Sequence, residues 1–508
     1  MLLPTEIWLE IATFLRRKFL ISLILVCRHF HRIFIRALYI NISIKLPDLN
    51  SPSNINDSEL GDFAFMGRPA ALLFTRLEAD STLKTFVRNI EITNLSQKSR
   101  ALLLSSPESA TNGVGKRDSS EDRLDDNAFG ALMRALVSLS CLESVLLIEA
   151  QIHFKWLVFL ASRSTPGLKL SLKRSELYGE LGDRFVLPDD EATEVIKVSS
   201  LSLISQITLK DASSVLAHFL LSPFVRRLDL GGLHPRALRK AFQSLNKLSL
   251  PHLEELKIQS LLRNDIAMLR AMPNLRKFSI KSCTGAIWDL LMEDLPSGHG
   301  PSGILKRLET ITVHQPWIRV FTAGRNITSI CSGDQPGTNH QWDPRILDTM
   351  DRHFGSNVMV TTLSWKSCKY PEALLEYLIR KNPGVRHLTI EPVNPGTSET
   401  IKCSQNPFFP PETPCACLKC CQEALDTYVH IFSLLPDLLT LEFHILVGVP
   451  AKAMLKWQQE RCQSLRKLGN KALVSVSFNS HTTWRRHPDD ERWRSYHLKT
   501  AMKSTEIM

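Results

Sequence analysis

Apolar residues recur with helical spacing through the first forty-odd residues of the chain. The first segment places four of them at i, i+3, i+4 and i+7, namely Trp8, Ile11, Ala12 and Leu15, which is the spacing of one helical face. The basic stretch Arg16-Arg17-Lys18 and an apolar run over residues 19–27 come next. A third segment has helical spacing again, with Cys27, Phe30, Phe34 and Ala37 on one face. The pattern predicts three short amphipathic helices within residues 1–44, the first two connected by the basic stretch.

A unit of three short helices has too little interior to bury all of its apolar side chains. We therefore expect part of this apolar surface to dock on a partner. A plain helical hairpin at the start of a larger domain, docking on nothing outside it, remains an alternative.

The pattern changes beyond residue 72, where short segments carry apolar residues at every second position. These strand-like segments cover residues 87–95, 142–150, 168–175, 204–212, 225–232, 253–260, 275–283, 308–315, 360–368, 385–393, 438–445 and 472–479. Helical patterns lie between several of them, which favours parallel β-α units and an α/β fold. An ordinary doubly wound α/β domain remains open as an alternative.

Composition divides the chain into segments. Residues 45–71 begin rich in Pro, Asn, Ser and Asp and are predicted to be a linker, so the repeating body spans residues 72–480. Two insertions interrupt that body: residues 105–127, with few large apolar residues and predicted disorder, and the Pro- and Cys-rich residues 392–421. Residues 481–508 are predicted to be a basic C-terminal tail.

The N-terminal segment resembles the F-box family over residues 2 to about 42. The matching positions occur in family order: Leu3-Pro4, Glu6-Ile7, Ile11, Leu15, Val26-Cys27-Arg28, Phe30 and Leu38-Tyr39. Two positions depart from the family: Arg16-Arg17-Lys18 precedes the second helix where an acidic residue is common, and Phe30 stands where Trp is common.

The resemblance implies a three-helix F-box that binds a Skp-type adaptor. Through a cullin and a RING partner, such a complex recruits the ubiquitin-charged enzyme and forms an SCF-type ubiquitin ligase. The residues expected to contact the adaptor are Leu3, Pro4, Ile7, Ile11, Leu15, Leu20, Leu23, Val26 and Phe30.

The body resembles the irregular leucine-rich repeats that often follow an F-box. Leu228 and Leu256 are 28 residues apart, and Leu256 and Phe278 are 22 apart, close to the period of such repeats. The expected fold is therefore α/β: a three-helix F-box followed by an irregular leucine-rich-repeat-like β-α solenoid. Because neighbouring strand residues point to opposite faces, we expect Lys257, Lys277, Lys281 and His387 to lie on the concave surface, outside the core.

Charge and hydropathy narrow the classes of partner. The net charge is +11, but residues 1–44 carry six basic and two acidic residues, and residues 450–508 carry twelve and five, so the middle has no net charge. A nucleic-acid groove along the body is disfavoured, since it needs clustered positive charge there. The apolar run over 19–27 is too short to span a bilayer and lacks the features of a signal peptide, so no membrane partner is expected. The odd number of cysteines, eleven, favours reduced thiols and an intracellular protein, cytoplasmic or nuclear.

One cysteine cluster has metal-ligand spacing. Cys417 and Cys420 form a C-x-x-C pair, and Cys403 and Cys415 or Cys421 could complete a thiolate set for a structural zinc. The alternative is a group of reduced thiols at the start of a helix.

No phosphate-binding loop, nucleophile elbow, HExxH or kinase signature is found in the sequence. The sequence therefore predicts a non-catalytic substrate receptor whose target is a protein. Two alternatives remain: a leucine-rich-repeat interaction scaffold with no ubiquitin-ligase role, and an enzyme built on an α/β body.

Overall fold

A computed structural model of the chain has a mixed α/β fold with a large, mostly parallel sheet. The chain divides into two compact units: unit 1 contains residues 1–259 and 267–272, and unit 2 contains residues 260–266 and 273–508. The structure describes residues 4–46, 68–95, 131–178, 196–204, 208–209, 219–220, 222–233, 250–261, 269–283, 305–314, 318–322, 325–333, 359–366, 372–391, 418–443, 452–467, 470–478, 482–487 and 492–497.

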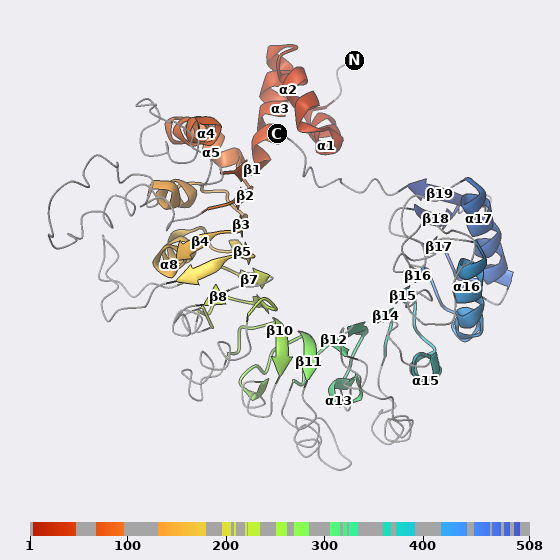
Figure 1. The fold of residues 1–508 in the computed structure, drawn as a ribbon. Coiled ribbons are helices and arrows are strands. Elements are labelled where there is room, and N and C mark those ends of the chain that lie inside the picture. Colours follow the sequence, from red (N-terminus) through yellow and green to blue (C-terminus); the bar gives the residue numbers. More distant parts are fainter. Residues whose placement is uncertain are drawn as a thin grey trace, which may run out of the picture. The chain divides into compact units, whose positions relative to one another are not determined.

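Three short helices open unit 1 (Figure 1). They are α1 (Thr5–Phe14), α2 (Arg17–Ile24) and α3 (Arg28–Ile40). Pro4 precedes α1 with φ −54°, and the Cys27 sulfur caps α3 by accepting a hydrogen bond from the Phe30 N–H at 3.5 Å. We call residues 4–40 the head. The prediction that Arg16-Arg17-Lys18 connects the first two helices was wrong, because α2 already begins at Arg17.

The head runs directly into the sheet of unit 1, since β1 (Asn41–Lys45) follows α3 without a linker. The strand order is β1, β2 (Asn89–Thr93), β3 (Ser144–Ile148), β5 (Lys169–Lys173), β7 (Ser200–Ile204), β9 (Arg227–Leu230) and β10 (Glu255–Leu261), each parallel to its neighbour. The helices of the rest of unit 1 include α4 (Arg68–Ala79), α5 (Ser81–Phe86) and α8 (Phe154–Arg163), and residues 131–137 are also helical. The segment expected as a linker, residues 45–71, thus contains the end of β1 and the start of α4; its middle part lies outside the described residues.

A second, three-stranded sheet in unit 1 contains β4 (Gln151–His153), β6 (Glu176–Tyr178) and β8 (Thr208–Leu209). Residues with positive φ end three strands of the larger sheet: Asn94 (64°), Glu149 (54°) and Arg174 (50°). Each donates its N–H to the last residue of the next strand, at 2.9, 2.9 and 3.1 Å. After Glu149 and Arg174 the same sharp turn therefore leads from the large sheet into the small one.

The sheet of unit 2 continues the same construction. Its parallel strands are β11 (Lys277–Cys283), β12 (Thr310–His314), β13 (Ser329–Gly333), β14 (Thr362–Lys366), β15 (His387–Glu391), β16 (Thr440–Phe443) and β17 (Ser475–Ser477). Two antiparallel strands, β18 (Thr482–Arg486) and β19 (Trp493–His497), complete it. Its helices are α13 (Ile318–Thr322), α15 (Glu372–Lys381), α16 (Leu418–Ser433) and α17 (Lys452–Lys467). The segment expected as a basic tail therefore begins with two strands of the sheet.

One hydrogen-bond arrangement recurs where the chain enters successive strands. Two consecutive N–H groups donate to one carbonyl of the preceding unit: Glu143 and Ser144 to Arg88 (2.7 and 3.0 Å), and Leu439 and Thr440 to Arg386 (2.8 and 3.0 Å). Because identical backbone bonds require identical local geometry, this recurrence shows that the chain enters these strands with the same local geometry.

Strand order decides between the sequence-based alternatives. In each unit, the strands of each sheet follow the order of the chain, whereas a doubly wound sheet reverses its order at a switch point. The doubly wound alternative therefore does not fit the described strands.

Alternation along the strands agrees with the expected burial. Leu256, Phe278, Ile280 and Leu388 are buried, whereas Lys277, Lys281 and His387 are exposed and Lys257 is half-buried. The strand predicted over residues 204–212 was placed too late in the sequence, because the strand of the large sheet in this region, β7, ends at Ile204. The insertion at residues 105–127 lies outside the described residues.

Candidate protein-binding surface of the head

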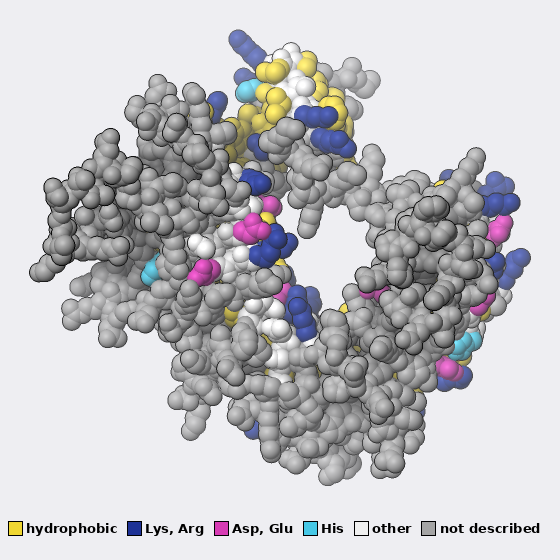
Figure 2. All heavy atoms as spheres, viewed as in Figure 1, with side chains coloured by type: hydrophobic (Ala, Val, Ile, Leu, Met, Phe, Trp, Pro, Cys, Tyr) yellow, Lys and Arg dark blue, Asp and Glu magenta, His cyan; other side chains and the backbone are white. Residues whose placement is uncertain are grey.

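Exposed apolar side chains concentrate on the head. Of the eleven exposed large hydrophobic residues in the described part of the chain, six belong to α1, α2 and the turn after α2. They are Ile7 (42% exposed), Phe14 (81%), Phe19 (49%), Ile21 (46%), Leu25 (80%) and Val26 (65%). Figure 2 shows the yellow apolar side chains gathered over these helices, with dark blue basic side chains among them. Apolar surface gathered in this way makes the head the candidate interaction site of the described residues.

The small core of the head explains why so much apolar surface remains outside. Only four residues of its core are buried: Ala12, Leu20, Ile33 and Phe34. An aromatic cluster extends that core, with the ring of Trp8 lying 5.0 Å from Phe30 and 6.0 Å from Phe34 between centroids. Because five of the eight residues of α2 are apolar, it can bury only those that face its neighbours, and Phe19 and Ile21 remain exposed.

The structure separates the nine residues expected to contact an adaptor into three groups. Pro4, Ile7 and Val26 are exposed, and Leu3 lies outside the described residues. Leu20 is buried in the core of the head. The remaining four are half-buried, and three of them pack against that core: Leu15, Leu23 and Phe30, with Ile11 as the fourth.

Sequence reasoning missed the most exposed members of the surface. Phe14 and Leu25 were not among the expected contact residues, nor were Phe19 and Ile21. The signal for Phe14 was available, because it lies off the helical face that Trp8, Ile11, Ala12 and Leu15 define.

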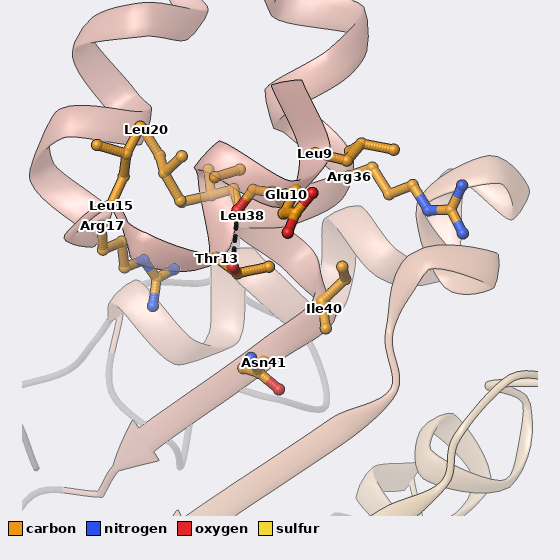
Figure 3. Close-up of a pocket in the computed structure, with 12 residues that line it drawn as sticks. Leu9, Glu10, Thr13, Leu15, Arg17, Leu20, Arg36, Leu38, Ile40 and Asn41 are labelled. Atoms are coloured by element: carbon orange, nitrogen blue, oxygen red, sulfur yellow. Dashed lines mark hydrogen bonds between the residues drawn. The ribbon is translucent and has the colours of Figure 1, made fainter. Parts of the chain in front are cut away.

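A shallow groove of about 500 Å³ lies where α1, α2, α3 and β1 come together. Its apolar lining comes from Leu9, Ala12, Leu15, Leu20, Ala37, Leu38 and Ile40. Figure 3 shows Arg17 and Arg36 on opposite sides of this groove and the hydrogen bond from the Thr13 hydroxyl to the Glu10 carbonyl, 2.7 Å long. The groove thus combines an apolar floor with cationic edges.

The charges of the head are not balanced within it. Its six basic residues include the consecutive and exposed Arg16, Arg17 and Lys18, whereas its acidic residues are Glu6 and Glu10. Within the described part of the chain, none of these basic residues forms an ion pair. The surface is therefore both apolar and cationic.

The cysteine cluster falls almost wholly outside the described residues. Cys403, Cys415 and Cys417 lie there; Cys420 is in the first turn of α16, and its side chain is not described. Among the residues that were searched, no group of three or more His, Cys, Asp or Glu could hold a metal ion. Zinc binding stays a prediction.

Three ionisable groups with shifted pKa values belong to unit 2. Desolvation lowers the pKa of the buried Arg325 guanidinium to about 10, and burial raises the pKa of the Cys462 thiol. The hydrogen bond from Arg380 is the largest cause of the lowered pKa of Glu376. Each shift has a local structural cause.

No described helix is long and apolar enough to cross a membrane. Comparison of the chain with protein-family models and with curated proteins found no match.

Proposed function

We propose that this chain is the substrate-recognition subunit of an SCF-type cullin–RING ubiquitin ligase. The head acts as the F-box and binds a Skp-type adaptor, while the body binds a target protein. The observation that carries the proposal is the concentration of exposed apolar side chains on α1 and α2, in the segment whose sequence resembles the F-box.

The size of this surface supports a docking role. A standard protein interface buries on the order of 1,600 Å² in total, and a few central apolar residues supply most of its energy. Phe14, Leu25 and Val26, which are 81%, 80% and 65% exposed, are suitable anchors of this kind.

The body is proposed to be an irregular leucine-rich-repeat-like solenoid. Strands in chain order and recurring hydrogen bonds at strand entrances support a stack of β-α units, each of which covers the apolar face of its neighbour. One side of each strand is apolar and buried, so the opposite side, with residues such as His387 and Thr389, is available for a target.

In this proposal the chain performs no catalysis. The cullin and RING partners bring the ubiquitin-charged enzyme, and this chain holds the target within its reach. The proposal also implies an intracellular protein with neither a nucleic-acid nor a membrane partner.

The test is capture of a purified Skp-type adaptor and cullin by the full-length chain. The triple variant Ile7→Ala/Leu25→Ala/Val26→Ala should fold normally, because all three side chains are exposed. Each fully buried aliphatic anchor contributes roughly 1.5–3 kcal/mol, so the variant should lose capture by a factor of about 100 or more.

A matched control removes exposed apolar residues from elsewhere. Leu72 and Met359 are 52% and 75% exposed but lie outside the head, so Leu72→Ala/Met359→Ala should leave capture unchanged. If the unaltered chain fails to bind the adaptor, the ligase proposal is wrong, and an interaction scaffold with no ligase role takes its place.

A further inference from the structure

We infer that residues 14–19 form a cationic aromatic anchor that docks on an acidic segment of the adaptor. This inference rests on the proposed function and adds the chemistry of one partner surface. The anchor consists of Phe14, Arg16, Arg17, Lys18 and Phe19.

The geometry of the turn presents both rings and cations to solvent. Phe14 is the last residue of α1 and is 81% exposed. Leu15 and Arg16 are extended, with ψ of 140° and 147°, and α2 begins at Arg17. The Lys18 ammonium lies 5.2 Å from the centroid of the Phe19 ring, a cation–π distance. Two aromatic side chains thus flank three cations within six residues.

No ion pair among the described residues uses the three cations. Arg16, Arg17 and Lys18 are exposed and form no ion pair with the described acidic residues. Arg17 and Lys18 also lie in the first turn of α2, where positive charge is unfavourable because it faces the positive end of the helix dipole. The described residues therefore leave these charges to be balanced by negative charge from outside the head.

The exposed aromatic residues of the turn indicate that the acidic surface on the partner also contains apolar groups. Phe14 and Phe19 need an apolar pocket, whereas the neighbouring cations need carboxylates around it. Charge pairs at the rim of an interface mainly accelerate association, and buried apolar anchors mainly slow dissociation. An acidic protein segment with an apolar pocket satisfies both halves of the turn.

An anionic membrane would also attract apolar and basic groups, but the turn fits it less well. Inserting two Phe side chains into a bilayer contributes little binding free energy. Even a complete acyl chain binds a protein to a membrane only weakly and reversibly. The remaining inward-facing residues of α2, such as Leu20, are committed to the core of the head.

The experiment measures binding kinetics between the full-length chain and a purified Skp-type adaptor over a range of salt concentrations. Arg16→Glu/Arg17→Glu/Lys18→Glu should slow association roughly tenfold or more at low salt and weaken its salt dependence. Phe14→Ala should instead accelerate dissociation about tenfold.

The matched control is Arg32→Glu/Lys306→Glu/Arg307→Glu, which makes the same change of net charge at exposed residues that are not part of the turn. It should change association no more than about twofold if local charge complementarity, and not net charge, is responsible. Hydrogen exchange over α1–α3 checks that every variant is folded.

The outcomes separate the two proposals. If the unaltered chain does not bind the adaptor, the proposed function fails and this inference fails with it. If it binds, but charge reversal at the turn has no effect or only the effect of the control, the anchor is overturned and the function stands. Binding of the unaltered chain to vesicles of phosphatidylcholine and phosphatidylserine, abolished by the charge reversal, would assign the turn to a membrane and also overturn the inference.

Discussion

The head and the strands of the body bury apolar side chains in different ways. In β15, Leu388 and Ile390 are 1% and 0% exposed, while His387 and Thr389 between and beside them face outward. In the head, Phe34 is fully buried, but Phe14 and Leu25 are at least 80% exposed. Apolar residues of the strands are covered, whereas many of those in the head are not.

The difference follows from the number of neighbours. Each inner strand of the parallel sheet lies between two others, and the apolar residues on one of its sides are buried. Among the described elements, α1 and α2 pack mainly against α3, and only α3 also contacts α5 and β1. Apolar surface that the described residues do not bury is available to a separate molecule.

The largest expected effect concerns the small core of the head. Phe34→Ala removes a fully buried ring and should cost about 3–5 kcal/mol, enough to unfold α1–α3. Hydrogen exchange should then rise over residues 5–40, while the strands from β2 onward keep their protection.

Phe14→Ala is the matched variant, because it removes the same side chain from a site that is 81% exposed. It should change stability by less than about 0.5 kcal/mol. Equal destabilisation by the two variants would mean that Phe14 also belongs to the core, and the contrast between the head and the body would disappear.

An intermediate effect is expected where the last strands join the body. The Trp484 indole N–H in β18 donates to the Gln458 side-chain oxygen in α17 at 2.8 Å, and both residues are buried. Gln458→Ala leaves this N–H without its acceptor and should cost about 1–3 kcal/mol, measured by denaturant unfolding. Gln459→Ala on the same helix is the control and should be nearly neutral. A neutral Gln458→Ala would indicate that β18 does not depend on α17.

The smallest expected effect is a pH-dependent loss of stability that involves the buried thiol of Cys462 and not the exposed thiol of Cys27. Cys462 in α17 is fully buried and Cys27 in the head is exposed. Burial raises the pKa of Cys462 in the folded state, so its contribution to stability is complete below the unfolded pKa, about 8.5, and declines as pH rises above it. The free energy of unfolding should therefore be about 1.4 kcal/mol lower at pH 9.5 than at neutral pH. Cys462→Ala should not show this part of the pH dependence.

Alkylation gives a second readout of the same contrast. In the native protein at neutral pH, Cys27 should react with iodoacetamide and Cys462 should not, because only an exposed thiolate is accessible to attack. Rapid modification of Cys462 without denaturant would contradict its burial.

Local periodicity determined much of this fold. The alternation of apolar residues predicted β15 and its buried face, and the helical spacing of Trp8, Ile11, Ala12 and Leu15 predicted α1. Both patterns are visible in a single segment, since the period of two or 3.6 residues is set by the backbone of that segment alone.

Weak local patterns explain the elements that were missed. β13 has the sequence SICSG, in which Ile330 is the apolar residue facing the core, so alternation had little to detect. β18 and β19 lie in a segment rich in basic residues, so its apolar alternation is weak, although Trp484 and Trp493 are each only 5% exposed. These strands form because neighbouring segments cover them.

The exposed apolar surface of the head shows the same division. The sequence by itself determined that residues 1–44 contain more apolar residues than three short helices can bury. Only the tertiary structure decided that Leu20 is inside and that Phe14 and Leu25 are outside. A helical pattern specifies which residues share a face, but the exposure of that face depends on which other parts of the chain pack against it.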